Sequence, residues 1–387
     1  MSTPALDPAA LQRLTDRLRR DIDAERYDGA VALLAHDGRI CLDEAIGYAD
    51  RAQKIPLTRD RVFVCWSLAK AFTAVTILQF VESGDLRLNM PVAAVLPEFG
   101  AAGKQHVTVG QLLCHTGGMS MSIPALPLEL QGNLAATYAA ICAAPLESMP
   151  GETVSYSPLQ GYTVLGELAR RLDGGTRPLH EVMAARIFRP LGMKDTWLGM
   201  RPDLVSRAVP VVFRDRDLGV LNPAGVEALG ALLLDPAMKA EIPGGGAIAT
   251  AGDVFRFAEM LRQGGVLDGV RLLSAATVRN MTQSHTGTKP NNVWNFARQM
   301  RGWPEVPAYL GHGVFVRGQG DHPTYLGALS SEDAFGTPGA GSTIYLVDRR
   351  RRLTFVCLTA GLMEESRSVE RFQYLCDLAQ CALLDLG

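Results

Sequence analysis

The chain has 387 residues, of which 47% are hydrophobic and 20% are charged, so it carries ample apolar side chain for a large core. Lysine and arginine together number 38 against 40 aspartates and glutamates, which gives a formal net charge of −2. A general nucleic-acid-binding protein is usually clearly basic, and we therefore expect no nucleic-acid partner. The one dense basic run, at residues 349–352, lies between two apolar segments and predicts a solvated hairpin turn.

The N-terminal segment and the spacing of the cysteines indicate the cellular compartment in which we expect the protein. The first residues contain no apolar stretch of signal-peptide length, and no segment reaches the roughly 18 apolar residues that a membrane-spanning helix needs. The seven cysteines are odd in number, scattered and never spaced as Cys-x-x-Cys. That pattern argues against a disulfide framework and against a zinc site. We therefore expect a cytoplasmic protein with no membrane span and no bound metal.

The first third of the chain alternates between helical and strand-like patterns. Leucines at helical spacing predict a helix from Pro8 to about Arg26. Two strand-like runs follow, and the Asp37-Gly38 pair between them is a strong hairpin signal. The elements that follow this helix are predicted, in chain order, as strands at 29–35, 39–46 and 62–66 and an amphipathic helix at 67–83.

The rest of the chain turns helical and then returns to strands. Residues 85–245 are rich in helical patterns with proline and glycine between them. The predicted helices are at 109–115, 161–172, 179–188, 253–263 and 364–386, and the predicted strands are at 313–317, 342–348 and 353–359. Strands at both ends of the chain around a helical middle predict an α+β fold with an all-α region.

Most sequence signatures of catalysis are absent. There is no Gly-x-Ser-x-Gly, Walker loop or His-Glu-x-x-His, and the glycines at 336, 339 and 341 have the wrong order for a dinucleotide-binding loop. We therefore expect no cofactor. What remains is Ser67-Leu68-Ala69-Lys70 at the start of a predicted helix, where positions i and i+3 share one face.

This spacing allows a serine nucleophile. A serine hydroxyl attacks only when a neighbouring base removes its proton, and a lysine serves as that base only if its pKa is lowered. Apolar neighbours such as Val64, Trp66 and Phe72 would supply the burial that lowers it. In the alternative interpretation, Ser67 is a helix N-cap and Lys70 a surface charge.

Further motifs extend the pattern of Ser67 and Lys70. They are VTVGQLLCHTGGM at 107–119, YSPLQGY at 156–162, PLGM at 190–193, the segment 243–252, and FGTPGAGSTIYLVD at 335–348. With residues 62–80 they resemble the serine β-lactamase and penicillin-binding-protein superfamily, closest to the class C-like branch that includes the family VIII carboxylesterases. The resemblance implies a β-lactamase/transpeptidase-like fold, in which an antiparallel sheet is flanked by helices. It also implies a discontinuous domain at 1–64 and 246–387 and a mainly helical domain at 65–245.

The resemblance assigns roles to individual residues. Ser67 matches the acylated serine, Lys70 the motif lysine and Tyr156 the tyrosine of the second motif. Beside a lysine ammonium the phenolate is favoured, so we expect Tyr156 to take the serine proton and later to protonate the leaving group. The backbone N–H groups of Ser67 and Ala340 are expected to form the oxyanion hole.

Two positions depart from the family pattern. Where β-lactamases of this branch have Lys-Thr-Gly, this chain has Thr337-Pro338-Gly339, and a threonine cannot supply a cation for a substrate carboxylate. Pro158 replaces the asparagine of the second motif and offers neither a side-chain amide nor a backbone N–H. Both losses affect the recognition of amide and carboxylate groups, and they favour esters over β-lactams as substrates.

Other residues have weaker claims. We expect His115, in the turn that resembles His-Thr-Ser-Gly, to be structural, and His312 and His322 to be solvated loop residues. Four aromatic residues are candidates either for the wall of an acyl pocket or for the core: Trp66, Trp294, Trp303 and Tyr309.

The expected function is a metal-independent serine hydrolase that cleaves small carboxylic esters through an acyl-enzyme on Ser67. An acyltransferase of the same fold is a close alternative, because transfer differs only in whether water or an alcohol takes the acyl group. The further alternatives are a D-amino-acid peptidase, a weak β-lactamase, or a non-catalytic penicillin-binding-like module. The sequence leaves the oligomeric state open.

Overall fold

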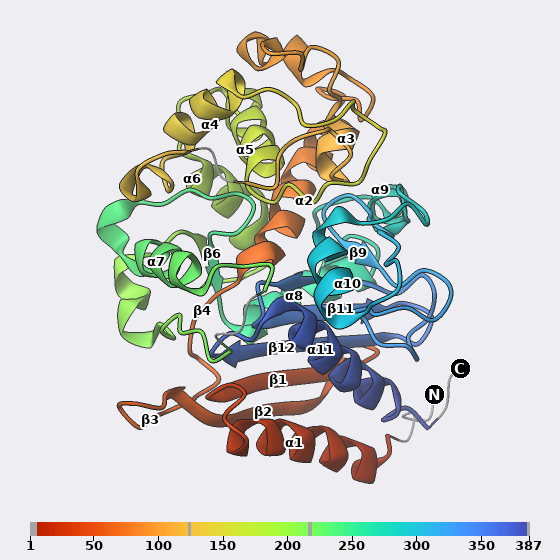
Figure 1. The fold of residues 1–387 in the computed structure, drawn as a ribbon. Coiled ribbons are helices and arrows are strands. Elements are labelled where there is room, and N and C mark those ends of the chain that lie inside the picture. The colour runs from red at the N-terminus through yellow and green to blue at the C-terminus, as the bar shows by residue number, and fades with distance from the viewer. Residues whose placement is uncertain (1–5, 123–124, 216–218, 385–387) are drawn as a thin grey trace.

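An antiparallel sheet of seven strands forms the lower half of the molecule in the computed structural model, which describes residues 6–122, 125–215 and 219–384 (Figure 1). Every neighbouring pair in this sheet is antiparallel. Its strands are, in the order in which they pair, β3 (Ile55–Pro56), β2 (Arg39–Asp50), β1 (Gly29–His36), β12 (Leu353–Ala360), β11 (Thr343–Asp348), β10 (Phe335–Gly339) and β9 (Phe315–Val316).

Two tight turns set the register of the central strands. Between β1 and β2, Asp37 and Gly38 have φ values of 51° and 78°, as a two-residue hairpin turn with positive φ at both positions requires. Between β11 and β12 the chain turns at residues 349–352, so the basic run lies in a hairpin turn as predicted. Both hairpins expected from the sequence are therefore confirmed.

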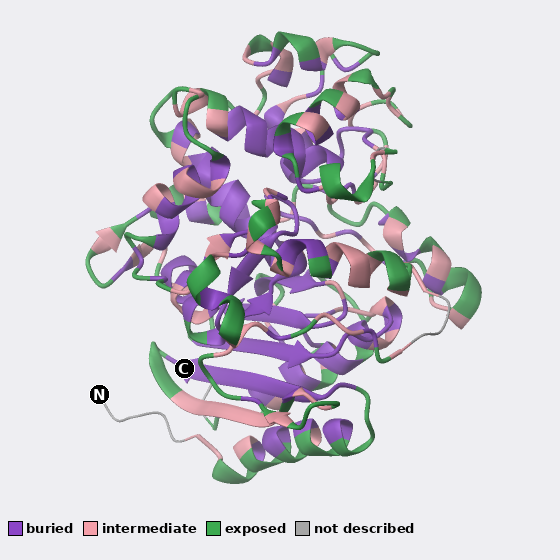
Figure 2. Ribbon diagram, turned by 90° about the vertical axis from the view of Figure 1, so that its left-hand side faces the viewer, coloured by how far each residue is buried: buried purple, intermediate pink, exposed green. Residues whose placement is uncertain are grey.

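Helices cover both faces of the sheet, and the alternation of side chains along β1 shows how. Ala32 and Leu34 pack in a core cluster with residues of α1 (Pro8–Asp23) and α11 (Glu365–Gln380). Val31 and Leu33 point to the other face, where α8 (Ala251–Arg262) contributes to a second and larger cluster. Because successive side chains face opposite sides, β1 is buried along its whole length (Figure 2).

The helical part of the molecule lies above the sheet in Figure 1 and surrounds α2 (Ala69–Glu82), which is buried on almost all sides. The other helices are α3 (Val109–Leu113), α4 (Leu134–Ala143), α5 (Gln160–Leu172), α6 (Leu179–Met183), α7 (Pro223–Leu234), α9 (Ala275–Thr282) and α10 (Asn295–Arg301). The remaining strands are β4 (Phe63–Val64), β6 (Ala247–Ala249) and β5 (Trp197–Leu198) in a small sheet, and the hairpin of β7 (Val266–Leu267) with β8 (Val270–Arg271).

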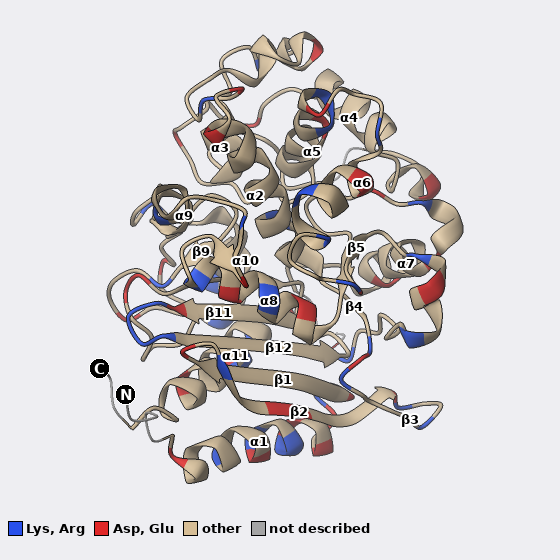
Figure 3. Cartoon of the chain, turned by 180° about the vertical axis from the view of Figure 1, so that it is seen from behind, with Lys and Arg blue, Asp and Glu red and all other residues tan. Residues whose placement is uncertain are grey.

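Helix α1 carries both acidic and basic residues along its length (Figure 3). Within the described residues no helix combines the length and the apolar character needed to cross a membrane.

The observed architecture confirms the predicted fold class, an α+β fold in which helices flank an antiparallel sheet next to a mainly helical region. Some predicted elements are shorter than expected. The strand predicted at 313–317 is limited to β9, because Gly313 and Gly318 on either side have φ values of 80° and 66°. The helix predicted at 179–188 is α6 followed by a π-helical turn at Ala184–Phe188.

Candidate active site

Ser67 lies in a tight turn between the small sheet and α2. A 3-10 turn at Trp66–Leu68 follows β4 and leads directly into α2, so Ser67 precedes the helix instead of starting it. Trp66 has a φ of 50°, in the left-handed region that side chains other than glycine rarely adopt. Strain of this kind persists where the surrounding structure imposes it, often at functional sites.

Lys70 meets Ser67 in a buried position. Its Nζ lies 2.8 Å from Ser67 Oγ and 2.6 Å from the carbonyl oxygen of Gly244, and the side chain is 2% exposed. Burial lowers the pKa of Lys70 well below 10.5, and the charge of Glu365 opposes this only in part. The amine is thus disposed to be neutral and to accept the proton of Ser67.

Tyr156 is the second partner of Ser67. Its hydroxyl donates to Ser67 Oγ at 3.0 Å, and its ring centroid is 5.1 Å from Lys70 Nζ. Burial raises the pKa of Tyr156 above the ordinary value of 10.0. This differs from the expectation of a phenolate stabilised by an ammonium, because burial raises the pKa of the phenol and lowers that of the Lys70 amine. In the resting site the proton therefore stays on Tyr156.

His115 supports this arrangement from behind. Its Nδ1 accepts a hydrogen bond from the backbone N–H of Ser157 at 3.1 Å, and its ring centroid lies 4.4 Å from that of Tyr156. Burial lowers the pKa of His115 well below 6.5, so the imidazole is neutral. The position of His115 fits the structural role expected of it.

Strand β10 approaches the Ser67 turn at Gly339. A Cβ on Gly339 would lie 2.4 Å from the carbonyl oxygen of Cys65 and 2.2 Å from Thr343 Oγ1, so only glycine permits this approach. Ala340 follows Gly339 in the chain and lines the same two cavities as Ser67. Neither the Ser67 nor the Ala340 N–H takes part in the turn and loop hydrogen bonds between described backbone groups.

Thr337 and Gly339 were expected to bind substrate as part of the third motif, but neither residue lines the cavities around Ser67. Thr337 is 1% exposed, and its hydroxyl is hydrogen-bonded to the carbonyl oxygen of Gly313 at 3.3 Å and to the Tyr345 hydroxyl at 3.2 Å. Pro338, the residue between them, lines one of the cavities around Ser67. Successive residues of β10 face opposite sides of the strand, so Thr337 and Gly339 lie on the side away from that of Pro338.

Two cavities meet at Ser67. We call one the aliphatic cavity; it has a volume of about 390 Å³, and its distinctive lining is Trp66, Val226, Leu229, Leu233 and Ile242. The other, the aromatic cavity, has a volume of about 330 Å³ and a distinctive lining of Tyr156, Trp294, Phe315, Tyr325 and Glu365. Ser67, Pro158 and Ala340 line both. The space around the serine is therefore divided into two compartments of different chemistry.

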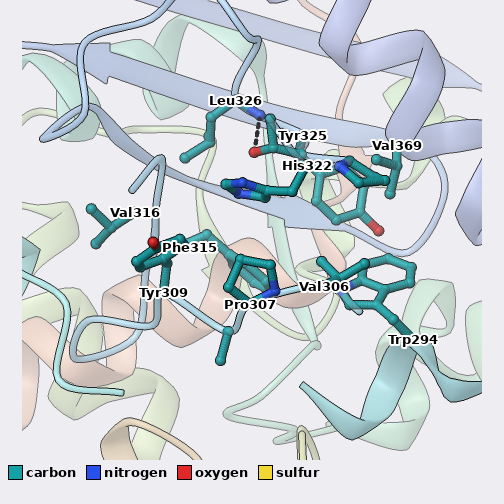
Figure 4. Close-up of a pocket in the computed structure, with 13 residues that line it drawn as sticks. Trp294, Val306, Pro307, Tyr309, Phe315, Val316, His322, Tyr325, Leu326 and Val369 are labelled. Carbon is teal, nitrogen blue, oxygen red and sulfur yellow. Dashed lines mark hydrogen bonds between the residues drawn. The ribbon is translucent and has the colours of Figure 1, made fainter. Parts of the chain in front are cut away.

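Several residues of the aromatic cavity were missed by the sequence analysis. Phe315, Tyr325 and Glu365 belong to segments far along the chain from Ser67, and no local motif marks them. Figure 4 shows Trp294, Phe315 and Tyr325 around a small neighbouring pocket that shares these three rings with the aromatic cavity. The only sequence signal was the aromatic character of Trp294, which was a candidate pocket residue.

The remaining candidates lie outside the two cavities. Trp303 packs against Trp294 at a centroid distance of 5.6 Å, and Tyr309 lines the small pocket together with His322. His312 is buried and stacks on His285 at 3.8 Å, so it is not the solvated loop residue that was expected. Within residues 6–122, 125–215 and 219–384, no group of three or more histidine, cysteine, aspartate or glutamate side chains could hold a metal ion.

Comparison with known sequences places the chain among related proteins. A family model described as "Beta-lactamase" matches residues 14–379. Penicillin-binding protein 4 of Amycolatopsis lactamdurans is 30% identical over 358 residues, which cover 90% of this chain and 89% of that protein. Esterase EstB of Burkholderia gladioli is 29% identical over 410 residues, covering 93% of this chain and 94% of the esterase.

Solved structures share the whole fold. A penicillin-binding protein homologue from Caulobacter crescentus superposes with a TM-score of 0.80 at 25% identity, over 98% of this chain and 99% of that one. A family VIII carboxylesterase gives a TM-score of 0.78 at 23% identity, with 97% and 99% covered, and supports the fold alone. With the family match across most of its length, this chain belongs to the β-lactamase family.

Proposed function

We propose that this protein is a serine hydrolase that cleaves carboxylic esters through an acyl-enzyme on Ser67. The observation that carries the proposal is the convergence of Lys70 Nζ and Tyr156 Oη on Ser67 Oγ, at 2.8 and 3.0 Å. One partner is a buried amine with a lowered pKa and the other a protonated phenol, so the serine has both a base and a proton donor. Esterases among the relatives, such as EstB, support this assignment.

The proposed reaction begins with Lys70 as the base. The neutral amine takes the proton of Ser67, Oγ attacks the ester carbonyl, and the N–H groups of Ser67 and Ala340 stabilise the oxyanion. As the carbon–oxygen bond breaks, Tyr156 gives its proton to the leaving alkoxide, and the proton on Lys70 restores the phenol. Water then enters, loses a proton to Lys70 and attacks the acyl carbon. The bond to Oγ breaks, the acid leaves, and Lys70 returns the proton to Ser67 Oγ.

Three features favour esters over β-lactams. Thr337 brings no cation to the cavities, and Pro158 lacks the amide that would bind the substrate carbonyl group. The aromatic cavity is lined by the carboxyl group of Glu365, whose negative charge would repel a substrate carboxylate. The aliphatic cavity offers an apolar wall for an acyl chain.

Acyl transfer is a second candidate, favoured by the separate compartment beside Tyr156. An acceptor alcohol could occupy the aromatic cavity that a leaving alcohol has vacated, while the acyl group stays in the aliphatic cavity. One structural relative, EstCE1, is described as a hydrolase with promiscuous acyltransferase activity, with a TM-score of 0.74 at 25% identity. Added butanol would then divert the acyl group from acid to butyl ester, which gas chromatography measures.

The proposal is tested with a panel of substrates and by identifying the serine that a covalent probe modifies. Purified protein is assayed against p-nitrophenyl esters of rising chain length, nitrocefin and a D-alanine p-nitroanilide. We expect ester turnover, and we expect Ser67→Ala to abolish it while Ser122→Ala, which alters another serine of the aromatic cavity, does not. A fluorophosphonate should add once, at Ser67, as peptide mass spectrometry shows.

Other outcomes assign the other functions. Preferential hydrolysis of nitrocefin or the anilide would point to a β-lactamase or a D-amino-acid peptidase. An adduct on a different serine would refute the nucleophile assignment, and a protein that is inert to all probes and to fluorophosphonate would be a non-catalytic binding module.

A further inference from the structure

Glu365 is an acid placed inside the candidate active site. It is the first residue of α11 and lines the aromatic cavity, where it is partly exposed. The Tyr325 hydroxyl donates to its Oε2 at 2.6 Å. Among the described residues no lysine or arginine forms an ion pair with Glu365, whereas its neighbour Glu364 is paired with Arg301 at 2.8 Å. The carboxylate is therefore oriented but lacks a counter-ion.

Aromatic rings surround the same space. Tyr156 and Phe315 have ring centroids 6.0 Å apart, Phe315 and Tyr325 are 6.1 Å apart, and Tyr325 and Trp294 are 5.7 Å apart. These four residues form a continuous wall of the cavity that Glu365 also lines. Faces of aromatic rings attract cations, and aromatic cages with an acidic group are suited to quaternary ammonium groups.

The proposed chemistry indicates which part of the substrate enters this cavity. Tyr156 is the proton donor to the leaving alcohol, and it lines the aromatic cavity but not the aliphatic one. The alcohol portion of the ester must lie beside the group that protonates it. We therefore expect the acyl chain of the ester to lie in the aliphatic cavity.

We propose that Glu365 and the aromatic wall bind a cationic ammonium group on the alcohol portion of the ester substrate. The inference rests on the proposed ester hydrolysis at Ser67 and adds a substrate class to it. The carboxylate supplies the charge, the rings supply the surrounding π-faces, and the hydrogen bond from Tyr325 fixes the carboxylate. The same arrangement disfavours alcohols that carry a carboxylate.

The preference depends on pH. Burial raises the pKa of Glu365 to about 7, while the Tyr325 hydrogen bond and the positive charges nearby oppose this shift. Above this value the side chain is an anion that attracts an ammonium group, and below it the carboxyl is neutral. The titratable and charged groups that act on Glu365 are Tyr325, Glu364, Arg371, Lys70 and Tyr156.

Two matched esters test the proposal. Butyrylcholine carries a trimethylammonium group on its alcohol, and its carbon isostere carries a neutral tert-butyl group of the same shape. We expect the ratio of their kcat/KM values to favour butyrylcholine by about tenfold or more above the pKa of Glu365 and to decline below it. Because the quaternary ammonium does not titrate, this decline reports the protein and not the substrate.

Glu365→Gln should lower the ratio at high pH to the value that the unmodified protein has below the pKa of Glu365, and should remove its pH dependence. Glu370→Gln removes the same charge from an exposed position of the same helix and should keep the ratio and its pH dependence. A ratio near one in the unmodified protein, or a preference whose size and pH dependence are unchanged by Glu365→Gln, would overturn the inference.

Binding separates failure of this inference from failure of the proposed function. Ser67→Ala cannot form the acyl-enzyme, so calorimetric affinities of this variant for the two esters give the charge preference without turnover. Equal affinities overturn the ammonium site even if both esters are hydrolysed by the unmodified protein. A preference for butyrylcholine that disappears in Ser67→Ala combined with Glu365→Gln supports the site, even if hydrolysis is absent and the proposed function is thereby wrong.

Discussion

Ser67 Oγ is the common partner of two buried groups whose pKa values move apart. Burial lowers the pKa of Lys70 and raises that of Tyr156, which supports the proposed roles of the amine as base and the phenol as acid. Environments that separate two pKa values in this way assign the acid and the base within a site. The sequence predicted that Ser67, Lys70 and Tyr156 act together, and the structure places their polar atoms within hydrogen-bond distance. The sequence assigned the first proton transfer to the phenolate, because it could not show how completely the lysine is buried.

Lys70→Ala and Tyr156→Phe should each lower kcat for a p-nitrophenyl ester by about a hundredfold or more, since each removes a positioned acid or base. The double variant should be little worse than either single one, because the proton that Lys70 takes from Ser67 is the one that restores Tyr156, so that the two residues form one proton relay. Steady-state kinetics of the four proteins measures this coupling.

Tyr162→Phe is the matched control for the tyrosine. Tyr162 is fully buried and donates its hydrogen bond to the carbonyl oxygen of Leu113 at 2.9 Å, not to Ser67, so loss of its hydroxyl should leave kcat within a few-fold of the unmodified value. Multiplicative losses in the double variant would show that Lys70 and Tyr156 do not share a proton relay.

The pH dependence of a neutral ester should follow Lys70. Only the unprotonated amine accepts the serine proton, so kcat/KM falls as the pH drops through the lowered pKa of Lys70. The charge of Glu365 raises that pKa, and Glu365→Gln should therefore move this acid limb to lower pH. A pH profile for p-nitrophenyl butyrate measures the shift, with Glu370→Gln as the control. An acid limb that moves to higher pH would contradict Lys70 as the titrating base.

At the scale of elements, the sequence was most informative where short-range rules apply. The Asp37-Gly38 hairpin and the helix from Pro8 depend on turn chemistry and on periodicity, and both are present. The strand–turn–helix around Ser67 was also expected, but the 3-10 turn at Trp66–Leu68 and the positive φ of Trp66 are imposed by packing against β10. Local propensity could not predict them.

The approach of β10 to the Ser67 turn yields a prediction at this scale. In Gly339→Ala the new Cβ would meet the Cys65 carbonyl oxygen and Thr343 Oγ1, so β10 must move away from the oxyanion site. We expect a stability loss of about 1–3 kcal/mol and a fall in kcat of roughly tenfold or more. Urea unfolding and ester kinetics measure the two effects.

Gly252→Ala is the matched control for this substitution. The nearest atom to its new Cβ would be Thr250 Oγ1 at 3.9 Å, and the position lies in α8. The variant should gain about 0.5–1 kcal/mol of stability and keep its activity. Full activity in Gly339→Ala would show that β10 need not stay in place for the oxyanion to be stabilised.

At the scale of the whole molecule, the site is assembled from segments that the sequence could not bring together. Ser67 and Tyr156 come from the helical part, Ala340 follows β10 of the sheet, and Glu365 begins α11. The family resemblance pointed to Ser67, Tyr156 and Ala340 in the sequence, because each of them lies in a short local motif. Glu365 and Phe315 belong to no such motif, and only the tertiary packing of α11 and β9 against the Ser67 turn places them in the cavity.

The division proposed for the chain, 1–64 with 246–387 and 65–245, need not correspond to two folding units. One core cluster runs from Val31 of β1 through α2 to α5 and α8 without interruption. At its centre Phe72 packs edge-on against Phe188 at 5.4 Å and against Phe257 at 4.6 Å, one ring from each proposed domain. A shared core of this kind couples the two parts energetically.

We therefore expect a single cooperative unfolding transition. Tryptophan fluorescence samples both parts, since Trp66 and Trp197 lie in the helical part and Trp294 and Trp303 lie in the other. Its urea midpoint should coincide with that of far-ultraviolet circular dichroism. Phe72→Ala should lower both midpoints together, by an amount that corresponds to about 3–5 kcal/mol, because the cavity that it leaves borders both parts. If the two probes separated in this variant, the parts would be independent units, and the site between them would depend on docking rather than on a common core.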